Sequence, residues 1–204
     1  WLEGACLAYL KKKGLVASNK PKDRKERMQA LKDNNEEKFI GAYVKEPIVG
    51  KYDWIYDLDL TSLYPSIIMT LNISPETKIG KIQNWDAERW IKGEDVGTYT
   101  IVGKDDTYEY TKEELAEVIK DSNLGVAANG VLYNQDKPGL IADILNDWFQ
   151  KRVEFRKLEK QYGEAGDTEK YEFYAKRQLV QKILLNSMYG VLGLPAFRFY
   201  DIDN

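Results

Sequence analysis

Two segments of this 204-residue sequence combine residue types that could bind a metal ion and a phosphorylated ligand. Asp59 comes near the end of the alternating apolar run Trp54–Leu60, which predicts a strand with a carboxylate close to its C-terminal end. Carboxylate oxygens are the donors that Mg²⁺ prefers. Lys182, Asn186 and Tyr189 are spaced i, i+4 and i+7, so one helical face would carry a cation, an amide and a phenol. Such a face is typical of a helix whose polar edge meets a ligand.

Two long helical patterns, about Leu140–Tyr162 and about Glu169–Val191, would hold further cations beside this face. A turn with two glycines near residue 165 and an Asp-Thr N-cap separate them, which predicts an antiparallel αα-hairpin. Arg152 then lies within about one helical turn of Lys182 along the axis, and Arg156 follows Arg152 at i+4. One hairpin can therefore present several phosphate-binding donors, although each cation taken alone also fits an ordinary solvated helix face.

The remaining pattern predicts an α+β fold with an antiparallel sheet. We expect a helix at Trp1–Lys12, a turn at Thr61–Ser66, a short helix or strand at Ile67–Leu71, a strand pair within 98–110, a helix from the Thr111 capping box to about Asp121, and a hairpin at Val126–Tyr133 around Asn129-Gly130. The predicted units are an N-terminal helix with a basic connector (1–38), a sheet region with an inserted strand and helix segment (39–139), the helical hairpin (140–192) and a return segment (193–204).

Composition narrows the chemistry that the chain can perform. The sequence has no His and one Cys, Cys6, which excludes imidazole catalysis, imidazole metal sites, an internal disulfide and a cysteine-cluster zinc site. The net charge is −3, yet residues 11–38 carry ten Lys/Arg against five Asp/Glu, which indicates a solvated arm, with a DNA contact as the alternative. No apolar stretch approaches the ~20 residues of a membrane span. Because the chain opens on Trp1 rather than Met, we expect it to come from a longer protein.

The two segments resemble a known family when they are read with their flanks. Asp59–Ile68 reads Asp-Leu-Thr-Ser-Leu-Tyr-Pro-Ser-Ile-Ile, and Lys182–Gly190 reads Lys-Ile-Leu-Leu-Asn-Ser-Met-Tyr-Gly. In this order they resemble the first two polymerase motifs of family B DNA polymerases, most closely the T4-like phage branch. Similar flanking stretches are Gly41-Ala-Tyr-Val-Lys-Glu-Pro, Asn72-Ile-Ser-Pro-Glu-Thr, Asn129-Gly130 and Phe197-Arg-Phe-Tyr-Asp-Ile-Asp-Asn. The resemblance covers about residues 39–204, with a shortened stretch between Thr77 and Val126, and implies the start of a palm and a fingers hairpin.

The family implies DNA-directed DNA polymerase activity, in which dNTPs are added to a primer 3′-hydroxyl under template direction with two Mg²⁺ ions. The resemblance places metal ligands at the Asp59 carboxylate and the Leu60 carbonyl. It brings the main chain of Ser62, Leu63 and Tyr64 to the triphosphate. The Tyr64 ring would lie under the sugar and clash with a ribose 2′-hydroxyl; a core tyrosine before a proline turn is the alternative.

The same resemblance assigns roles along the hairpin. The residues that would bind the triphosphate, arginines bidentately and lysine as a point charge, are Arg152, Arg156, Lys182 and Asn186. Lys182 would also donate a proton to the leaving pyrophosphate. Tyr189 and Gly190 would pack near the nascent base pair.

The third family motif, which carries the second catalytic aspartate, is absent from the sequence. Tyr200-Asp-Ile-Asp-Asn looks similar to it but comes too soon after the second motif, so Asp201 and Asp203 are predicted to be structural or to lie behind the metal ligands. Asp57 lies on the same predicted strand face as Asp59, and we do not expect it to bind the metal. Without a second carboxylate the isolated chain should be inactive, either as a partial sequence or as one subunit of a polymerase split between genes.

The implied partners are primer–template DNA, dNTPs and the remaining polymerase segments, in cis or in trans: the exonuclease, the thumb and the palm segment with the third motif. A sliding clamp and a single-strand-binding protein are further family expectations. No membrane partner is expected, and the cytoplasm, of an infected host if the chain is phage-derived, is the expected location. Two other interpretations stay open: a non-catalytic nucleotide- or DNA-binding subunit of a split polymerase, and a helical-hairpin interaction protein with solvated cations. The latter predicts no dNTP affinity.

Overall fold

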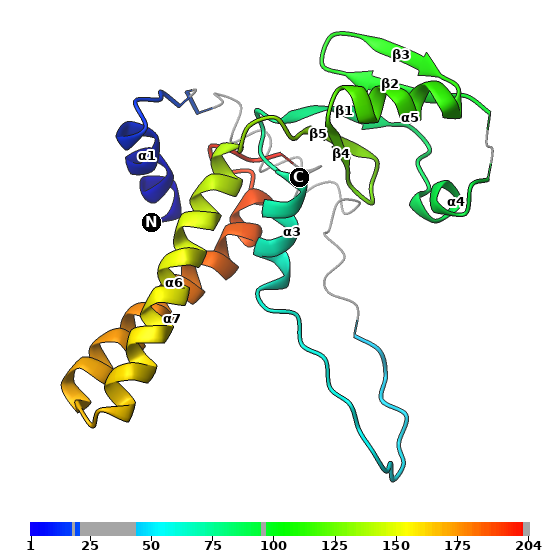
Figure 1. The fold of residues 1–204 in the computed structure, drawn as a ribbon. Coiled ribbons are helices and arrows are strands. Elements are labelled where there is room, and N and C mark those ends of the chain that lie inside the picture. The colour runs from blue at the N-terminus through cyan, green and yellow to red at the C-terminus, as the bar shows by residue number, and fades with distance from the viewer. Residues whose placement is uncertain (18, 21–43, 95–96, 202–204) are drawn as a thin grey trace.

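The computed structural model describes residues 1–17, 19–20, 44–94 and 97–201. Most of the basic segment at 11–38 and the flank at residue 41 therefore lie outside the described residues, and their predicted roles stay predictions. The helical hairpin and the sheet extend in different directions from a region around helix α3 (Figure 1). Within the described ranges, no helix is both long and apolar enough to cross a membrane.

Two helices of 25 residues, α6 (Leu140–Glu164) and α7 (Thr168–Leu192), form the antiparallel hairpin that the sequence predicts (Figure 1). Helix α7 begins at the predicted N-cap, since the Asp167 carboxylate accepts a hydrogen bond from the backbone N–H of Lys170 at 3.1 Å. Near the turn, the ring of Tyr162 on α6 stacks on that of Tyr174 on α7, with centroids 5.5 Å apart. Local signals in the sequence were therefore sufficient to predict this element.

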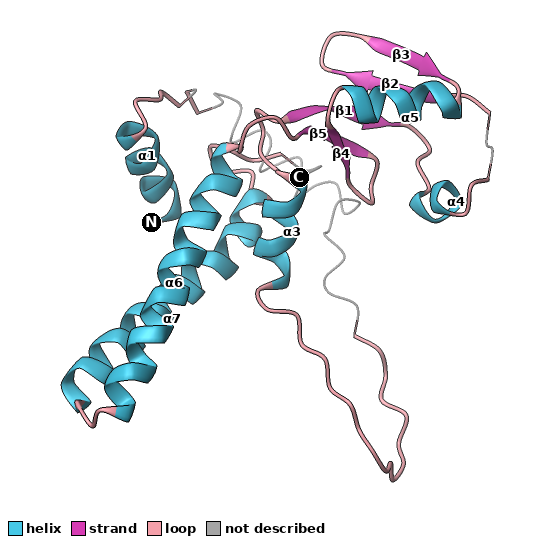
Figure 2. Cartoon of the chain, viewed as in Figure 1, coloured by secondary structure: helices cyan, strands magenta, loops and turns pink. Residues whose placement is uncertain are grey.

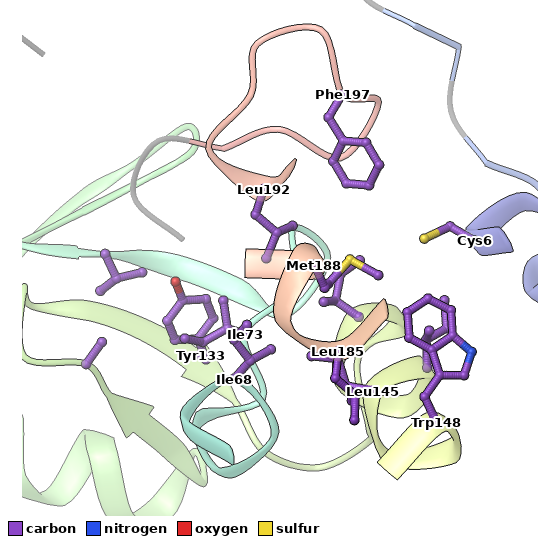
Figure 3. Packing of buried hydrophobic residues seen from close by; sticks show 14 residues of the cluster. Cys6, Ile68, Ile73, Tyr133, Leu145, Trp148, Leu185, Met188, Leu192 and Phe197 are labelled. Carbon is purple, nitrogen blue, oxygen red and sulfur yellow. The ribbon is translucent and has the colours of Figure 1, made fainter. Parts of the chain in front are cut away.

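Two shorter helices pack against the end of the hairpin remote from its turn: α1 (Leu2–Lys12) and α3 (Leu63–Leu71). Leu145 on α6, Leu185 and Met188 on α7 and Ile68 on α3 are buried in one cluster, which Cys6 of α1 joins (Figure 3). Each large apolar side chain that is fully buried contributes about 1.5–3 kcal/mol. This cluster therefore fixes α3 against the hairpin, and it confirms the N-terminal helix and the helical alternative for the segment after residue 66.

The second part of the molecule is a five-stranded antiparallel sheet in the order β3-β2-β1-β5-β4. Its elements in chain order are β1 (Lys78–Ile82), α4 (Ala87–Ile91), β2 (Tyr99–Gly103), β3 (Thr107–Tyr110), α5 (Lys112–Asp121), β4 (Leu124–Val126) and β5 (Val131–Asn134). A second core forms where Leu115 of α5 meets Ile82 and Leu132 of the sheet. The α+β class, the strand pair at 98–110, the capping box before α5 and the hairpin around Asn129-Gly130 are confirmed.

The sequence did not predict strand β1 or helix α4. Gly80 interrupts the short strand Lys78–Ile82 and weakens its pattern. The structure gives the reason for this glycine, because a Cβ there would lie 2.7 Å from the carbonyl oxygen of Val102 on β2. The close approach of the β1 and β2 backbones thus requires glycine at position 80, and the same glycine makes the strand hard to predict from the sequence.

The predicted strand at Trp54–Leu60 is wrong for this structure. Residues 44–62 precede α3 and form an extended segment that contains no strand (Figure 2). In this segment Trp54 is 100% and Tyr56 86% exposed. Apolar alternation indicates which face of a strand is buried, but a strand also needs a neighbour to complete its hydrogen bonds. No described segment pairs with these residues. The predicted turn at Thr61–Ser66 is shorter than expected, because α3 begins at Leu63 with Pro65 in its first turn, where a missing N–H costs little.

A polar cluster of Asn72, Ser74 and Glu76 joins α3 to the start of α6. The buried Asn72 amide donates to the carbonyls of Asn134 at 2.7 Å and Lys137 at 2.8 Å, and its Oδ1 accepts from the Gly139 N–H at 2.7 Å. Ser74 and Glu76 accept hydrogen bonds from the first two N–H groups of α6, which has no side-chain cap of its own. This Asn72 cluster therefore fixes the position of α6 relative to α3.

Candidate nucleotide-binding site

Ser62 turns the exposed segment into α3 beside the hairpin. It is the N-cap of α3 and adopts a left-handed backbone conformation, with φ 52° and ψ 51°. This conformation is uncommon for a residue other than glycine and occurs often at functional sites. The Ser62 hydroxyl accepts a hydrogen bond from Nη1 of Arg152 at 3.1 Å. Two predicted site residues that are 90 positions apart in sequence thus lie in contact.

Arg152 is half-buried on α6 with part of its guanidinium still available. Its Nε is buried and has no hydrogen-bond partner among the described residues. Burial, and then the neighbouring charge of Arg156, lower the pKa of the Arg152 guanidinium. A buried donor without a partner and an adjacent like charge both disfavour this cation on its own. An anion bound at the accessible part of the guanidinium would offset the repulsion between the two arginines, so the local chemistry fits a phosphate group.

Tyr64 and Tyr189 bring α3 and α7 together at the same place. Their rings stack with centroids 4.5 Å apart and an interplanar angle of 6°. Tyr64 remains 40% exposed and Tyr189 39% exposed, so an open aromatic surface lies at the junction. Leu63, the first residue of α3, is also exposed beside Tyr64.

The other predicted residues of the hairpin point away from its core. Lys182, Asn186 and Gly190 are exposed on α7, whereas Leu185 and Met188 on the same helix are fully buried. A Cβ built on Gly190 would meet nothing within 4 Å, so packing within the described residues does not explain this glycine. The spacing i, i+4 and i+7 thus produces the common face that it predicted.

The cations on the hairpin differ in their partners. Several form ion pairs within their own helix, namely Lys151 with Asp147, Lys160 with Glu164 and Lys176 with Glu172. Among the described residues, Arg156 and Lys182 have no such carboxylate partner. Exposed pairs at i, i+4 contribute only about 0.3–0.5 kcal/mol each, so the absence of such a pair at Arg156 and Lys182 changes stability little and leaves both cations available to a ligand.

Asp59 and Leu60 are not brought into contact with the other predicted residues. Both lie on the exposed segment that leads to Ser62 (Figure 1). A carboxylate and a main-chain carbonyl are hard oxygen donors, so the pair fits one side of a Mg²⁺ shell. In the part of the chain that the structure describes, no group of three or more His, Cys, Asp or Glu side chains could hold a metal ion. The donor set among the described residues is therefore partial.

Asp201 belongs to the stretch that looks similar to the third family motif, and it forms an ion pair within the fold. Lys78 of β1 donates to both of its carboxylate oxygens, at 2.9 and 2.8 Å. This contact agrees with the predicted structural role, because it ties the return segment to the sheet. Asp203 lies outside the described residues.

The sequence model of the family described as DNA polymerase family B matches residues 2–203. The chain belongs to DNA polymerase family B. Its relatives include the "DNA-directed DNA polymerase" of Escherichia phage RB69, 32% identical with 81% of this chain and 21% of the relative covered. The "DNA polymerase 1" of Pyrococcus abyssi is 30% identical, with 91% and 18% covered.

A solved structure of the family B DNA polymerase from Pyrobaculum calidifontis matches the fold with a TM-score of 0.58 at 25% identity, covering 98% of this chain and 20% of that one. The resemblance inferred from the two motifs is thereby confirmed. This family B chain spans about one fifth of the length of the relatives that it matches.

Proposed function

We propose that this chain supplies the nucleotide-binding part of a DNA polymerase active site, which adds dNTPs to a primer 3′-hydroxyl under template direction. In this proposal residues 39–139 begin the palm, and the hairpin at 140–192 acts as the fingers. The observation that carries the proposal is the junction of α3 and α6. There the partly satisfied guanidinium of Arg152 meets Ser62. Family membership supports the same conclusion.

The triphosphate would bind along the polar face of the hairpin. Arg152 and Arg156 lie one turn apart on α6 and would grip phosphate oxygens bidentately. Lys182 and Asn186 on α7 would add a point charge and an amide donor. Each charge-assisted hydrogen bond contributes about 1.5–3 kcal/mol, so removing one of these side chains should weaken dNTP binding by about 10- to 100-fold.

The chemical step would form a bond between the primer 3′-oxygen and the α-phosphorus while the bond to the pyrophosphate oxygen breaks, and the proton of the 3′-hydroxyl would be released to water. Lys182 would hold the leaving pyrophosphate and donate a proton to it. Asp59 and the Leu60 carbonyl would hold Mg²⁺, which when bound activates the 3′-hydroxyl and neutralises the triphosphate, with two ions in the complete enzyme. Main-chain groups of Ser62, Leu63 and Tyr64 would approach the triphosphate, and Tyr189 and Gly190 the nascent base pair.

The Tyr64 ring would lie beneath the sugar of the incoming nucleotide and exclude a 2′-hydroxyl. Its exposure at the start of α3, rather than burial in a core, supports this role over a purely structural one. Replacement of Tyr64 by Ala should therefore relax discrimination against ribonucleotides. Unchanged discrimination in this variant would contradict the assignment.

We further propose that the 204-residue chain binds nucleotides but does not extend primers on its own. Primer–template DNA and the remaining polymerase segments, namely the exonuclease, the thumb and the palm segment with the third motif, would act with it in cis or in trans. A sliding clamp and a cytoplasmic location, in an infected host for a phage-derived protein, belong to the same proposal. The exposed apolar residues of segment 44–62 support a further protein segment beside Asp59, because Trp54, Tyr56 and Leu58 are otherwise in water.

Binding can be tested by calorimetric titration of the chain with dATP and Mg²⁺. Lys182→Ala should lower the affinity by about tenfold or more. Lys176→Ala is the matched control, since Lys176 lies on the same helix but pairs with Glu172 at 3.2 Å. Equal losses in both variants, or no dATP binding by the unmodified chain, would refute the proposal and favour a helical-hairpin interaction protein.

Magnesium-dependent primer extension tests the incomplete metal site. The chain alone should show no extension, either unmodified or as Asp59→Ala. Extension that Asp59→Ala abolishes would mean that a second carboxylate lies within the chain, with Asp57, Asp201 and Asp203 as the candidates. A non-catalytic subunit of a split polymerase is distinguished by extension that appears only when a separate polypeptide with the third motif is added.

A further inference from the structure

We propose that Tyr189 is a second determinant of sugar selectivity, because its ring holds the ring of Tyr64 in the position from which it excludes a 2′-hydroxyl. This inference rests on the proposed function, in which Tyr64 faces the sugar. Tyr189 would act as a positioning residue, through Tyr64, in addition to any contact of its own with the nascent base pair.

The two tyrosines differ in how firmly the backbone holds them. Tyr64 is the second residue of α3, so no preceding helical turn lies beneath its side chain, and the residue before the helix, Ser62, is in a left-handed conformation. Tyr189 lies within α7, so preceding helical turns lie beneath its side chain. Each tyrosine adjoins a fully buried residue, Met188 beside Tyr189 and Pro65 beside Tyr64, so the preceding turns are what restrict the Tyr189 ring more than the Tyr64 ring.

The contact between the two rings restricts how far the Tyr64 ring can move toward Tyr189. The planes are nearly parallel, at 6°, with centroids 4.5 Å apart, so Tyr189 covers one face of the Tyr64 ring. The two residues are 125 positions apart in sequence, and the contact depends on the packing of α3 against α7 through Ile68 and Met188. One face of Tyr64 is thus occupied by protein, while the side chain as a whole stays 40% exposed to a ligand.

A steric filter discriminates only to the extent that the filtering side chain resists displacement. A tyrosine ring turns about two side-chain torsions, and a ribonucleotide could bind if the Tyr64 ring moved aside. Such movement would break the stack, so the stack adds to the cost of accepting a 2′-hydroxyl. Loss of an aromatic stack of this kind should reduce discrimination by about fivefold.

The test compares dATP with ATP, which differ only at the 2′ position, by ligand-observed NMR titration of the chain with Mg²⁺. The unmodified chain should bind dATP more tightly than ATP. Tyr189→Ala should lower this ratio by about fivefold, whereas Tyr189→Phe should keep it, because stacking needs the ring and not the hydroxyl. Tyr108→Ala is the matched control, since it removes another tyrosine stack, with Tyr110 at 6.4 Å, in the sheet.

The stack itself has a readout that needs no nucleotide. Ring protons of a selectively labelled Tyr64 should be shifted upfield by the Tyr189 ring, and the shift should disappear in Tyr189→Ala and persist in Tyr189→Phe and Tyr108→Ala. An unchanged dATP-to-ATP ratio in Tyr189→Ala, or equal affinities in the unmodified chain, overturns the inference. Absence of binding for both nucleotides overturns the proposed function, and this inference with it.

Discussion

Replacement of Asn72 by Ala tests how α3 is fixed to α6. Asn72 makes three side-chain hydrogen bonds, to Asn134, Lys137 and Gly139 at 2.7–2.8 Å, and it is 5% exposed. At about 1 kcal/mol per bond their loss costs about 3 kcal/mol. Asn72 also has a φ of 56°, a left-handed conformation that costs about 1 kcal/mol more for Ala. We therefore expect the free energy of unfolding to fall by about 4 kcal/mol.

Urea denaturation followed by far-UV circular dichroism measures this change. Asn84→Ala is the control, because Asn84 has a similar φ of 52° but is exposed and makes no side-chain hydrogen bond within the described residues. This variant should lose only about 1 kcal/mol. Equal losses in the two variants would show that backbone conformation alone sets the effect. The reasoning about the Asn72 cluster would then be refuted.

Three further predictions follow from buried contacts and charges. Gly139→Ala should destabilise the chain by about 2 kcal/mol or more, since a Cβ there would lie 2.6 Å from that of Ser74; a melting temperature equal to that of the unmodified chain would contradict this. Burial raises the pKa of the Cys6 thiol to about 11, so alkylation near pH 8 should require unfolding, and rapid labelling of the folded chain would show otherwise. The Lys170 backbone N–H, followed by the Lys170 side chain, lowers the pKa of Asp167 below 3.8. The contribution of the ionised Asp167 carboxylate to stability should be complete above pH 3.8 and disappear as the pH falls through the lower pKa of the folded chain. Acid titrations of the melting temperature should show this dependence in the unmodified chain and not in Asp167→Asn.

The elements that local sequence could specify were predicted well. The hairpin boundary at Asp167 and the capping box at Thr111 depend on residues within one helical turn, and both form as expected. The turn at Asn129-Gly130 is likewise local, and it joins β4 to β5. Such signals need no knowledge of the rest of the chain.

Features that depend on distant partners could not be predicted in the same way. Alternation around Asp59 predicts a strand, but pairing needs a neighbour that no described segment provides. In the sequence Gly80 interrupts the strand pattern, and only the structure shows that the neighbouring Val102 carbonyl leaves no room for a side chain at this position. The contact of Arg152 with Ser62 and the stack of Tyr64 on Tyr189 join residues far apart in sequence, and neither follows from spacing.

The stretch Asn72-Ile-Ser-Pro-Glu-Thr carries a signal that family resemblance alone does not explain. The resemblance predicts a flank of the first motif and assigns no role to the side chains of this stretch. Its polar residues satisfy the backbone at the start of α6, the helix that carries Arg152. An uncapped helix start at a glycine could have indicated that another segment provides these acceptors.

The central claim is that the junction of α3, α6 and α7 binds the triphosphate of an incoming nucleotide. Its most direct test is a two-dimensional NMR titration of the isotope-labelled chain with dATP and Mg²⁺, read residue by residue. We predict saturable shifts at Ser62–Tyr64, at Arg152 and along Lys182–Gly190, with the sheet unaffected. Shifts confined to the sheet, or none at any nucleotide concentration, would contradict the claim.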